Sequence, residues 1–103
     1  MPGVVVTVLF QADAETARRV ESEHAETHRA VIELARQHGM RSHRRLYGDG
    51  EFIDIDEWDS VEDREAFLAV AAPYLRELSE ARGSPPPVAK IWHEATDDEG
   101  GTG

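Results

Sequence analysis

The chain has 103 residues, of which 40% are hydrophobic and 31% are charged, a composition typical of one small globular domain. Its formal net charge of −10 argues against nucleic acid and anionic membranes as partners, because both bind basic surfaces. The lack of Cys excludes a disulfide framework, a thiolate metal site and a Cys nucleophile. With no leader pattern at its start and no run of about 18 apolar residues, the protein is expected to be cytoplasmic.

The first third of the sequence predicts a buried strand followed by one long helix. The run VVVTVLF, Val4 to Phe10, is apolar and rich in β-branched residues, as in strands that are buried on both faces. Asp13 is suited to cap a helix, and apolar residues then recur every three or four positions as far as His38. Gly39 is suited to end this helix. We therefore expect a single helix over residues 14–38, about seven turns long.

A β-hairpin is predicted next. Its strands are expected at residues 41–47 and 51–58, where β-branched and aromatic residues are frequent. The sequence Gly48-Asp49-Gly50 between them is a strong signal for a tight turn.

The rest of the sequence predicts a second helix, a last strand and a tail. Ser60 is suited to cap a helix that ends at Gly83, and Pro73 within it predicts a kink or a break into two helices. Residues 88–93 are predicted to form the last strand. Residues 95–103 are acidic and Gly-rich, which is typical of a disordered tail.

The predicted order of strand, helix, strand, strand, helix and strand is the βαββαβ order of ferredoxin-like folds. We expect an α+β domain over residues 1–94, with a four-stranded antiparallel sheet and both helices on one of its faces. A domain this small has few apolar side chains to share between a core and a pocket, so two copies are expected to pair as a homodimer.

The register of the hairpin decides which of its side chains share a face. A two-residue turn at Asp49-Gly50 pairs Arg45 with Asp54 and His43 with Asp56, and these opposite charges favour the register by roughly a few tenths of a kcal/mol per pair. One face, here named the mixed face, then carries aromatic and polar side chains together: His43, Arg45, Tyr47, Phe52, Asp54, Asp56 and Trp58. The other, named the aliphatic face, carries Arg44, Leu46, Ile53, Ile55 and Glu57.

The mixed face is unusual for an antiparallel sheet, which normally turns an apolar face to its helices and a polar face to water. If helices cover one face of the sheet and a second subunit covers the other, the mixed face becomes the wall of a pocket. The sequence leaves open which of the two faces meets the helices.

The strand FIDIDEWDS, the helix start VEDREAF and the preceding segment His43-Arg44-Arg45-Leu46-Tyr47 resemble the antibiotic biosynthesis monooxygenase superfamily. The resemblance covers residues 4–94 and implies a dimeric α/β barrel made of two ferredoxin-like subunits. It also implies oxygenation of quinols, anthrones or naphthacenones without metal or flavin, although other members degrade haem. Only Asp56 and Trp58 match the acidic-to-Trp end of the family's strand. Many members have a His nine to eleven residues after that Trp, where this chain has Phe67 and Ala69, so haem binding does not carry over.

Three His are candidates for acid–base chemistry. His24 and His28 are four residues apart and share the apolar side of the predicted helix, so they are either pocket imidazoles or partly buried side chains satisfied by hydrogen bonds. His43 faces Asp56, which is either a carboxylate that orients a catalytic imidazole or the partner in an ordinary ion pair. We take His24, His28, His43 and Asp56 as the candidate catalytic residues.

The candidate substrate-binding residues are aromatic or charged: Arg45, Tyr47, Phe52, Asp54, Trp58 and Tyr74. The aromatic ones are suited to stack on an aromatic substrate, or they form part of the core. Arg45 either pairs with Asp54 or binds an anionic group. No metal or other cofactor is expected; if a metal binds, its ligands are His24, His28 and His43.

Together with the candidate residues, the resemblance implies a small tailoring enzyme that acts on an aromatic, polyketide-like or quinol substrate. The expected reaction is a cofactor-independent oxygenation in which a base removes a proton and the carbanion reacts with O₂. A polyketide cyclase or isomerase begins with the same proton abstraction and remains an alternative. Two further hypotheses stay open, a non-catalytic dimer that binds a small molecule and a His-based metal protein.

Overall fold

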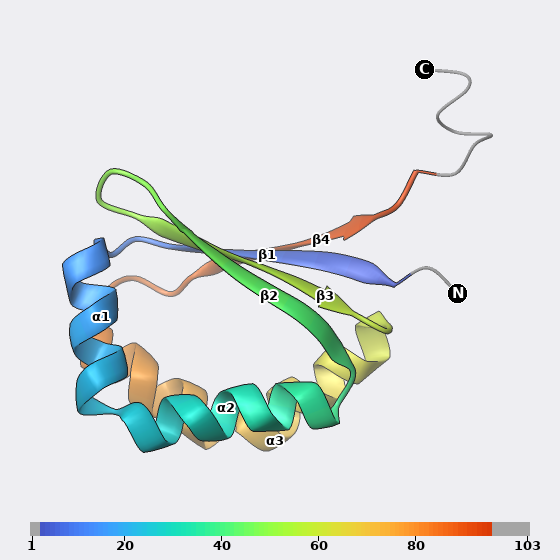
Figure 1. The fold of residues 1–103 in the computed structure, drawn as a ribbon, viewed down its shortest axis with the longest axis horizontal. Coiled ribbons are helices and arrows are strands. Elements are labelled where there is room, and N and C mark those ends of the chain that lie inside the picture. The colour runs from blue at the N-terminus through green and yellow to red at the C-terminus, as the bar shows by residue number, and fades with distance from the viewer. Residues whose placement is uncertain (1–2, 96–103) are drawn as a thin grey trace.

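The computed structural model describes residues 3–95 and shows one layer of helices against one face of a four-stranded sheet (Figure 1). The predicted ferredoxin-like α+β fold is confirmed, with one helix more than expected. The elements in chain order are β1 (Val4–Phe10), α1 (Ala14–Glu23), α2 (Ala25–Gln37), β2 (Met40–Tyr47), β3 (Phe52–Trp58), α3 (Val61–Arg82) and β4 (Val88–His93). The expected tail at residues 95–103 lies outside the described residues, except for residue 95.

The sheet has the strand order β2-β3-β1-β4, and all neighbouring strands are antiparallel. The predicted hairpin register is confirmed, because Arg45 pairs with Asp54 and His43 pairs with Asp56. The N–H of Gly48 donates to the carbonyl of Glu51 at 2.8 Å and closes the two-residue turn.

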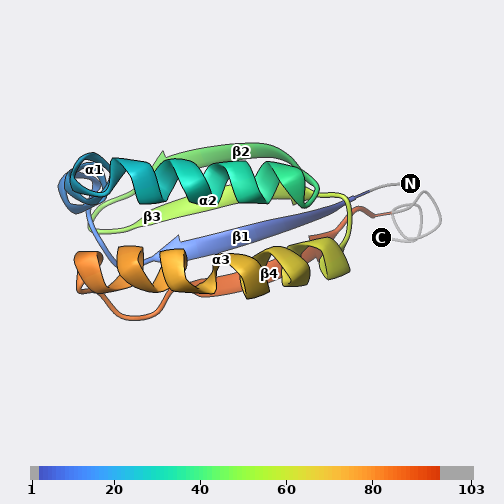
Figure 2. The same cartoon turned by 90° about the horizontal axis from the view of Figure 1, so that it is seen from below.

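The single helix predicted for residues 14–38 is wrong, because the chain bends at His24 and forms α1 and α2 instead. A straight helix of this length would extend about 37 Å, whereas strands of seven residues extend about 23 Å. The bend lets α1 cross one end of the sheet while α2 runs along it (Figures 1 and 2). Glu77 of α3 holds the bend, since its carboxylate accepts hydrogen bonds from His24 Nδ1 at 2.8 Å and Thr27 Oγ1 at 2.6 Å.

The second predicted helix is continuous, and the expectation of a break at Pro73 is wrong. Its predicted ends are confirmed. The hydroxyl of Ser60 accepts a hydrogen bond from the N–H of Asp63 at 3.1 Å, and Gly83 follows the helix with a φ of 65°, in the left-handed region.

The mixed face is the one that meets the helices. Phe52, Asp54 and Trp58 of β3 are buried, and the alternating side chains of β1 share this face with them. The prediction that β1 is buried on both faces is therefore only half right: within one chain, Val4, Val6 and Phe10 are buried, and the residues between them are partly exposed.

The core has two parts. The larger one lies where α2 and α3 meet the sheet near Trp58, whose ring centroid is 5.1 Å from that of Phe67. The smaller one lies under α1 at the opposite end of the sheet, where the rings of Phe10 and Phe52 stack with centroids 4.5 Å apart. Between the two parts the helix layer and the sheet are not tightly packed, and this position holds the cavity described below.

The aliphatic face has no cover from within the described chain, as the bare side of the sheet in Figure 1 shows. Leu46, Val88 and Trp92 are 44%, 56% and 50% exposed. Trp92 keeps one polar contact, since its indole N–H donates to Thr7 Oγ1 at 2.9 Å. None of the helices in residues 3–95 combines the length and apolarity that crossing a membrane requires.

Candidate functional site

A cavity of about 410 Å³ lies between the mixed face of the sheet and the helix layer. Its lining is mostly apolar, with contributions from β1, β2, β3, all three helices and the start of β4. The polar side chains among the lining residues are Glu21, His28, His43, Arg45, Asp54, Asp56, Arg64, Arg76, Ser79 and Arg82. A mainly apolar cavity with a few convergent polar groups is the usual form of a small-molecule site.

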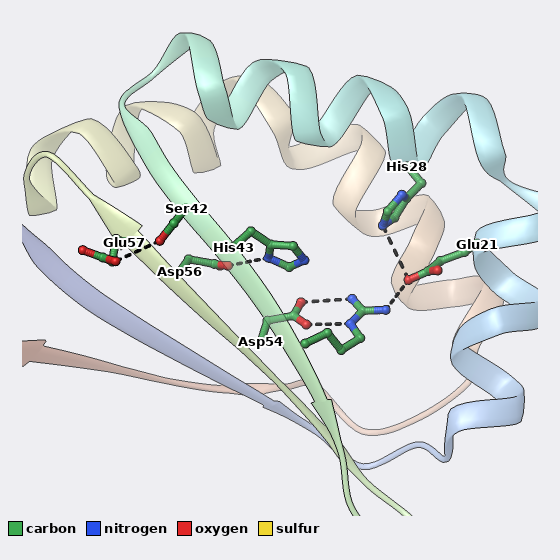
Figure 3. Close-up of polar contacts among 8 residues, drawn as sticks. Glu21, His28, Ser42, His43, Asp54, Asp56 and Glu57 are labelled. Carbon is green, nitrogen blue, oxygen red and sulfur yellow. Dashed lines mark hydrogen bonds and ion pairs between the residues drawn. The ribbon is translucent and has the colours of Figure 1, made fainter.

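His43 and Asp56 form one polar contact in the wall of the cavity (Figure 3). The N–H at Nδ1 of His43 donates to Asp56 Oδ1 at 2.6 Å, which leaves Nε2 without a protein partner among the described residues. β2 is an edge strand whose residues are mostly exposed, but only 30% of the His43 side chain is exposed. The hydrogen bond that His43 donates to Asp56 raises the pKa of His43 above its ordinary value, against the opposing effect of burial.

Arg45 lies two residues further along β2 and is held by two carboxylates. Its guanidinium donates to both oxygens of Asp54, from Nε at 2.6 Å and from Nη2 at 3.0 Å. Its remaining nitrogen, Nη1, contacts Glu21 of α1. Burial alone would lower the pKa of Arg45, but the hydrogen bonds and charge of Asp54 and the charge of Glu21 outweigh it and raise the pKa. This network joins α1 to the hairpin.

His28 enters the same cavity from α2, on the other side from His43 (Figure 3). Its Nε2 lies 3.6 Å from Glu21 Oε1, which is a looser contact than the one between His43 and Asp56. Burial lowers the pKa of His28, and the positive charges of Arg45 and His43 lower it further, although Glu21 acts in the opposite direction. The cavity therefore holds one imidazole that favours the neutral form and one that favours the protonated form.

Trp58 contributes an unused hydrogen-bond donor. Its side chain is 2% exposed and lines the cavity next to Phe67. The indole Nε1 is buried, and no acceptor for it is found within residues 3–95. An unpaired buried donor is costly, so the packing of the indole against its neighbours must offset this cost.

Most of the predicted site residues line the cavity. The structure brings together His28, His43, Arg45, Phe52, Asp54, Asp56 and Trp58. His24 does not join them, because it ends α1 and bonds Glu77 outside the cavity. Tyr47 and Tyr74 do not line it either, and their exposed fractions are 42% and 39%.

The alternative metal site is not assembled. His24 is tied to Glu77 outside the cavity, so the set of His24, His28 and His43 does not converge. In the part of the chain that the structure describes, no three His, Asp or Glu side chains are grouped closely enough to hold a metal ion. These three His were expected to converge because His24 and His28 would share one face of a single helix. The chain bends at His24, so the two residues do not share a helix face.

Sequence reasoning missed four charged residues of the cavity: Glu21, Arg64, Arg76 and Arg82. A usable signal exists for Arg64 and Arg82. They extend the apolar side of α3 at spacings of three to four residues, one turn beyond Phe67 and Leu78 at either end. No comparable signal exists for Glu21, because its position depends on the bend between α1 and α2.

The cavity can therefore bind a flat apolar molecule and exchange protons with it. The neutral imidazole of His28 is suited to accept a proton, and the imidazolium of His43 is suited to donate one. The aromatic side chains of the lining offer flat contacts to such a molecule.

No family model matches the chain, and no curated protein sequence matches it significantly. Solved structures do match over most of the chain. A point mutant of SnoaB, a cofactor-independent oxygenase from Streptomyces nogalater, has a TM-score of 0.66 and 19% identity, covering 93% of this chain and 96% of that one. A putative antibiotic biosynthesis monooxygenase from Deinococcus radiodurans has a TM-score of 0.59 and 15% identity, covering 90% and 93%.

A third match is a dimeric ferredoxin-like protein from an uncultured marine organism. Its TM-score is 0.71 at 7% identity, and the match covers 93% of this chain and 90% of that one. Identities this low establish a shared fold and leave the chemistry to be argued from the site. The chain shares the ferredoxin-like α+β fold with these three proteins over nearly its whole length.

Proposed function

We propose that the protein is a cofactor-independent monooxygenase that acts on a small aromatic molecule with an acidic C–H or phenol group. The observation that carries this proposal is the pair of imidazoles in one cavity, His28 and His43, whose pKa values move in opposite directions. Two titratable groups separated in this way are suited to the roles of base and acid in one reaction. The fold shared with SnoaB, a cofactor-independent oxygenase, supports oxygenation as the reaction type.

In this proposal His28 is the base. Its neutral imidazole takes a proton from a CH₂ group between two aromatic rings, as in an anthrone, and leaves a carbanion. The carbanion combines with O₂ to form a peroxide, which takes a proton from His43. Loss of water from the peroxide, with removal of the second C–H proton, gives a carbonyl. In the balance CH₂ and O₂ become C=O and H₂O, and no external reductant is needed.

Asp56 and Trp58 support these steps without exchanging protons with the substrate. Asp56 holds the tautomer of His43, so that Nε2 points away from the carboxylate. The indole of Trp58 forms part of the wall against which the ring system of the substrate packs, which helps to place the reacting carbon near the two imidazoles.

We also propose that two copies pair through the aliphatic face. Leu46, Val88 and Trp92 are large apolar side chains that this face leaves exposed. An apolar sheet face of this kind is typical of a protein–protein interface. One structural match is itself a dimeric ferredoxin-like protein. Sedimentation of the full chain tests this point, and Leu46→Asp should shift the protein toward the monomer.

Oxygen uptake with anthrone as substrate tests the catalytic proposal. His28→Gln should lower kcat by about a hundredfold or more, because it removes the base. His43→Asn should also lower kcat, and it should remove the basic limb of the pH profile. His24→Gln is the matched control, since His24 lies outside the cavity, and its kcat should stay within about twofold of the parent's.

The same experiment separates the competing functions. A product formed without oxygen uptake, with the same dependence on His28, would identify a cyclase or isomerase in place of an oxygenase. Binding of anthrone without any product would identify a non-catalytic binding protein. Equal rates for the parent and for His28→Gln would remove the base assignment altogether.

A further inference from the structure

Three arginines of α3 line the cavity, namely Arg64, Arg76 and Arg82. Arg76 is exposed, whereas Arg64 and Arg82 are half-buried, and no carboxylate forms an ion pair with either of these two within residues 3–95. Arg45 in the same cavity contacts two carboxylates. A charged side chain that is partly removed from water without a partner is costly, so each of these arginines offers a place for an anion.

Arg82 is the better prepared of the two. Its guanidinium carbon lies 4.6 Å from the centroid of the Phe10 ring, and Phe10 stacks on Phe52. This cation–π contact supports the guanidinium without using its N–H donors, and a guanidinium with free donors is suited to bind a carboxylate. Asp54, whose charge acts on Arg82, already accepts hydrogen bonds from Arg45 on both of its oxygens.

The surroundings of Arg82 do not fully compensate its charge. Burial lowers its pKa, and the positive charge of Arg45 lowers it further, whereas Asp54 raises it. An arginine remains protonated regardless, so the lowered pKa marks a cation that is stabilised less well than in water. The end of α3 favours a cation in its last turn, which accounts for an arginine at this point of the helix but not for its position over the cavity.

The charges of the residues that line the cavity also favour an anionic ligand. Four arginines line the cavity against three carboxylates, whereas the chain as a whole carries a net charge of −10. Positive charge is thus concentrated in this cavity, whereas the net negative charge of the rest of the chain would repel the same anion.

The cavity is also long. Phe52 and Trp58 both line it and stand six residues apart on β3, which corresponds to about 20 Å along the strand. Arg82 lies over the Phe10 and Phe52 end, and Trp58 marks the other end. A ligand that contacts both ends must be elongated, with the two imidazoles along its length.

We infer that the natural ligand is an elongated aromatic acid whose carboxylate is bound by Arg82, while its ring system extends toward His43 and Trp58. This inference rests on the proposed function, because both place a small aromatic molecule in the same cavity. It adds a charge requirement that separates acidic substrates from neutral ones.

Calorimetric binding of 2-naphthoate and its neutral analogue 2-naphthamide to the full chain tests the inference. The parent should bind 2-naphthoate more tightly. Arg82→Gln should lower the affinity for 2-naphthoate by about tenfold or more and change the affinity for 2-naphthamide by less than about twofold. Arg82→Lys keeps the charge but not the planar pair of N–H donors, so its affinity for 2-naphthoate should lie between those of the parent and Arg82→Gln. Arg36→Gln is the matched control, because Arg36 is exposed in the last turn of α2 and does not line the cavity.

The outcomes distinguish this inference from the proposed function. Equal affinity of the parent for the acid and the amide, or an unchanged preference in Arg82→Gln, would overturn the inference. Loss of the preference in Arg64→Gln but not in Arg82→Gln would overturn the assignment to Arg82. Neither result depends on turnover, so an inactive protein that still prefers the acid through Arg82 would contradict only the oxygenase proposal.

Discussion

Two pairs of opposite charge lie side by side on the mixed face, two residues apart on the same strands. Arg45 and Asp54 form one pair, and His43 and Asp56 form the other. Arg45 donates to both oxygens of Asp54 and also contacts Glu21, whereas His43 has a single hydrogen bond to Asp56. The Arg45 pair has a permanent cation whose donors are bound by carboxylates of the protein. The His43 pair has a titratable cation, and one ring nitrogen of His43 has no hydrogen-bond partner among the described residues.

The difference shows how one hairpin can serve both stability and chemistry. Arg45 is committed to the fold, because its donors are used in joining β2, β3 and α1. His43 is held at Nδ1 and keeps Nε2 for the cavity. The register therefore places a structural pair and a reactive pair on one face, and substitutions that exchange their properties test the distinction.

The largest effect is expected when Arg45 is removed. Arg45→Met leaves Asp54, whose side chain is 12% exposed, and Glu21 without their shared cation. Loss of one partner of a buried pair costs about 3 kcal/mol or more, so the free energy of unfolding should fall by roughly that amount. Urea unfolding at pH 7 measures the change. The double variant Arg45→Met with Asp54→Leu should recover a large part of it, and a loss below about 1 kcal/mol in the single variant would contradict the structural role.

A smaller, pH-dependent effect is expected from Arg45→His. The imidazole is too short to reach both carboxylates, so stability is lost at every pH. The remaining stabilisation requires the protonated ring, so it should be present in mild acid and disappear as the pH rises. Unfolding at pH 5.5 and pH 8.5 compares the two states. A variant that is equally stable at both values would show that the carboxylates around position 45 do not need a cation.

The hairpin was predictable from the sequence because its signals are local. Gly48-Asp49-Gly50 fixes the turn, and once the turn has two residues every cross-strand pair follows, including the two charged ones. The direction of the mixed face was not predictable. Its choice depends on how α2 and α3 cover the sheet, and a face with two carboxylates is not the one that apolarity alone would bury.

The bend at His24 could not be read from the sequence either. The segment around it contains no Gly or Pro, and its apolar spacing continues through the break. The bend follows from tertiary structure, since Glu77 of α3 accepts hydrogen bonds from His24 and Thr27. One misplaced helix was enough to put His24 in the candidate site and to omit Glu21, which α1 brings to Arg45.

His43→Arg should give a modest effect on stability and a clear change in its pH dependence. The pKa of His43 is raised from its ordinary value of 6.5, so its contribution is complete below about pH 6.5 and is lost as the pH rises through the folded pKa. Arginine keeps the charge at all pH values and should remove that loss, with a change of about 1 kcal/mol or less at pH 6. The unfolding free energy between pH 6 and pH 9 measures it. Parallel pH profiles for the parent and the variant would argue against the raised pKa.

The smallest effect is expected from His28, and its sign is opposite. Its lowered pKa means that the folded state favours the neutral ring, so its contribution is present above about pH 6.5 and is lost as the pH falls through the folded pKa. His28→Gln removes the cost of burying a protonated ring, so it should lower stability less at pH 5 than at pH 8, by a difference of about 1 kcal/mol or less. Urea unfolding at the two pH values measures this difference. The contributions of His43 and His28 to stability change in opposite directions with pH, so in the parent they partly cancel. The free energy of unfolding should therefore rise with pH in His43→Arg and fall with pH in His28→Gln. Slopes of the same sign would show that the two imidazoles do not differ as proposed.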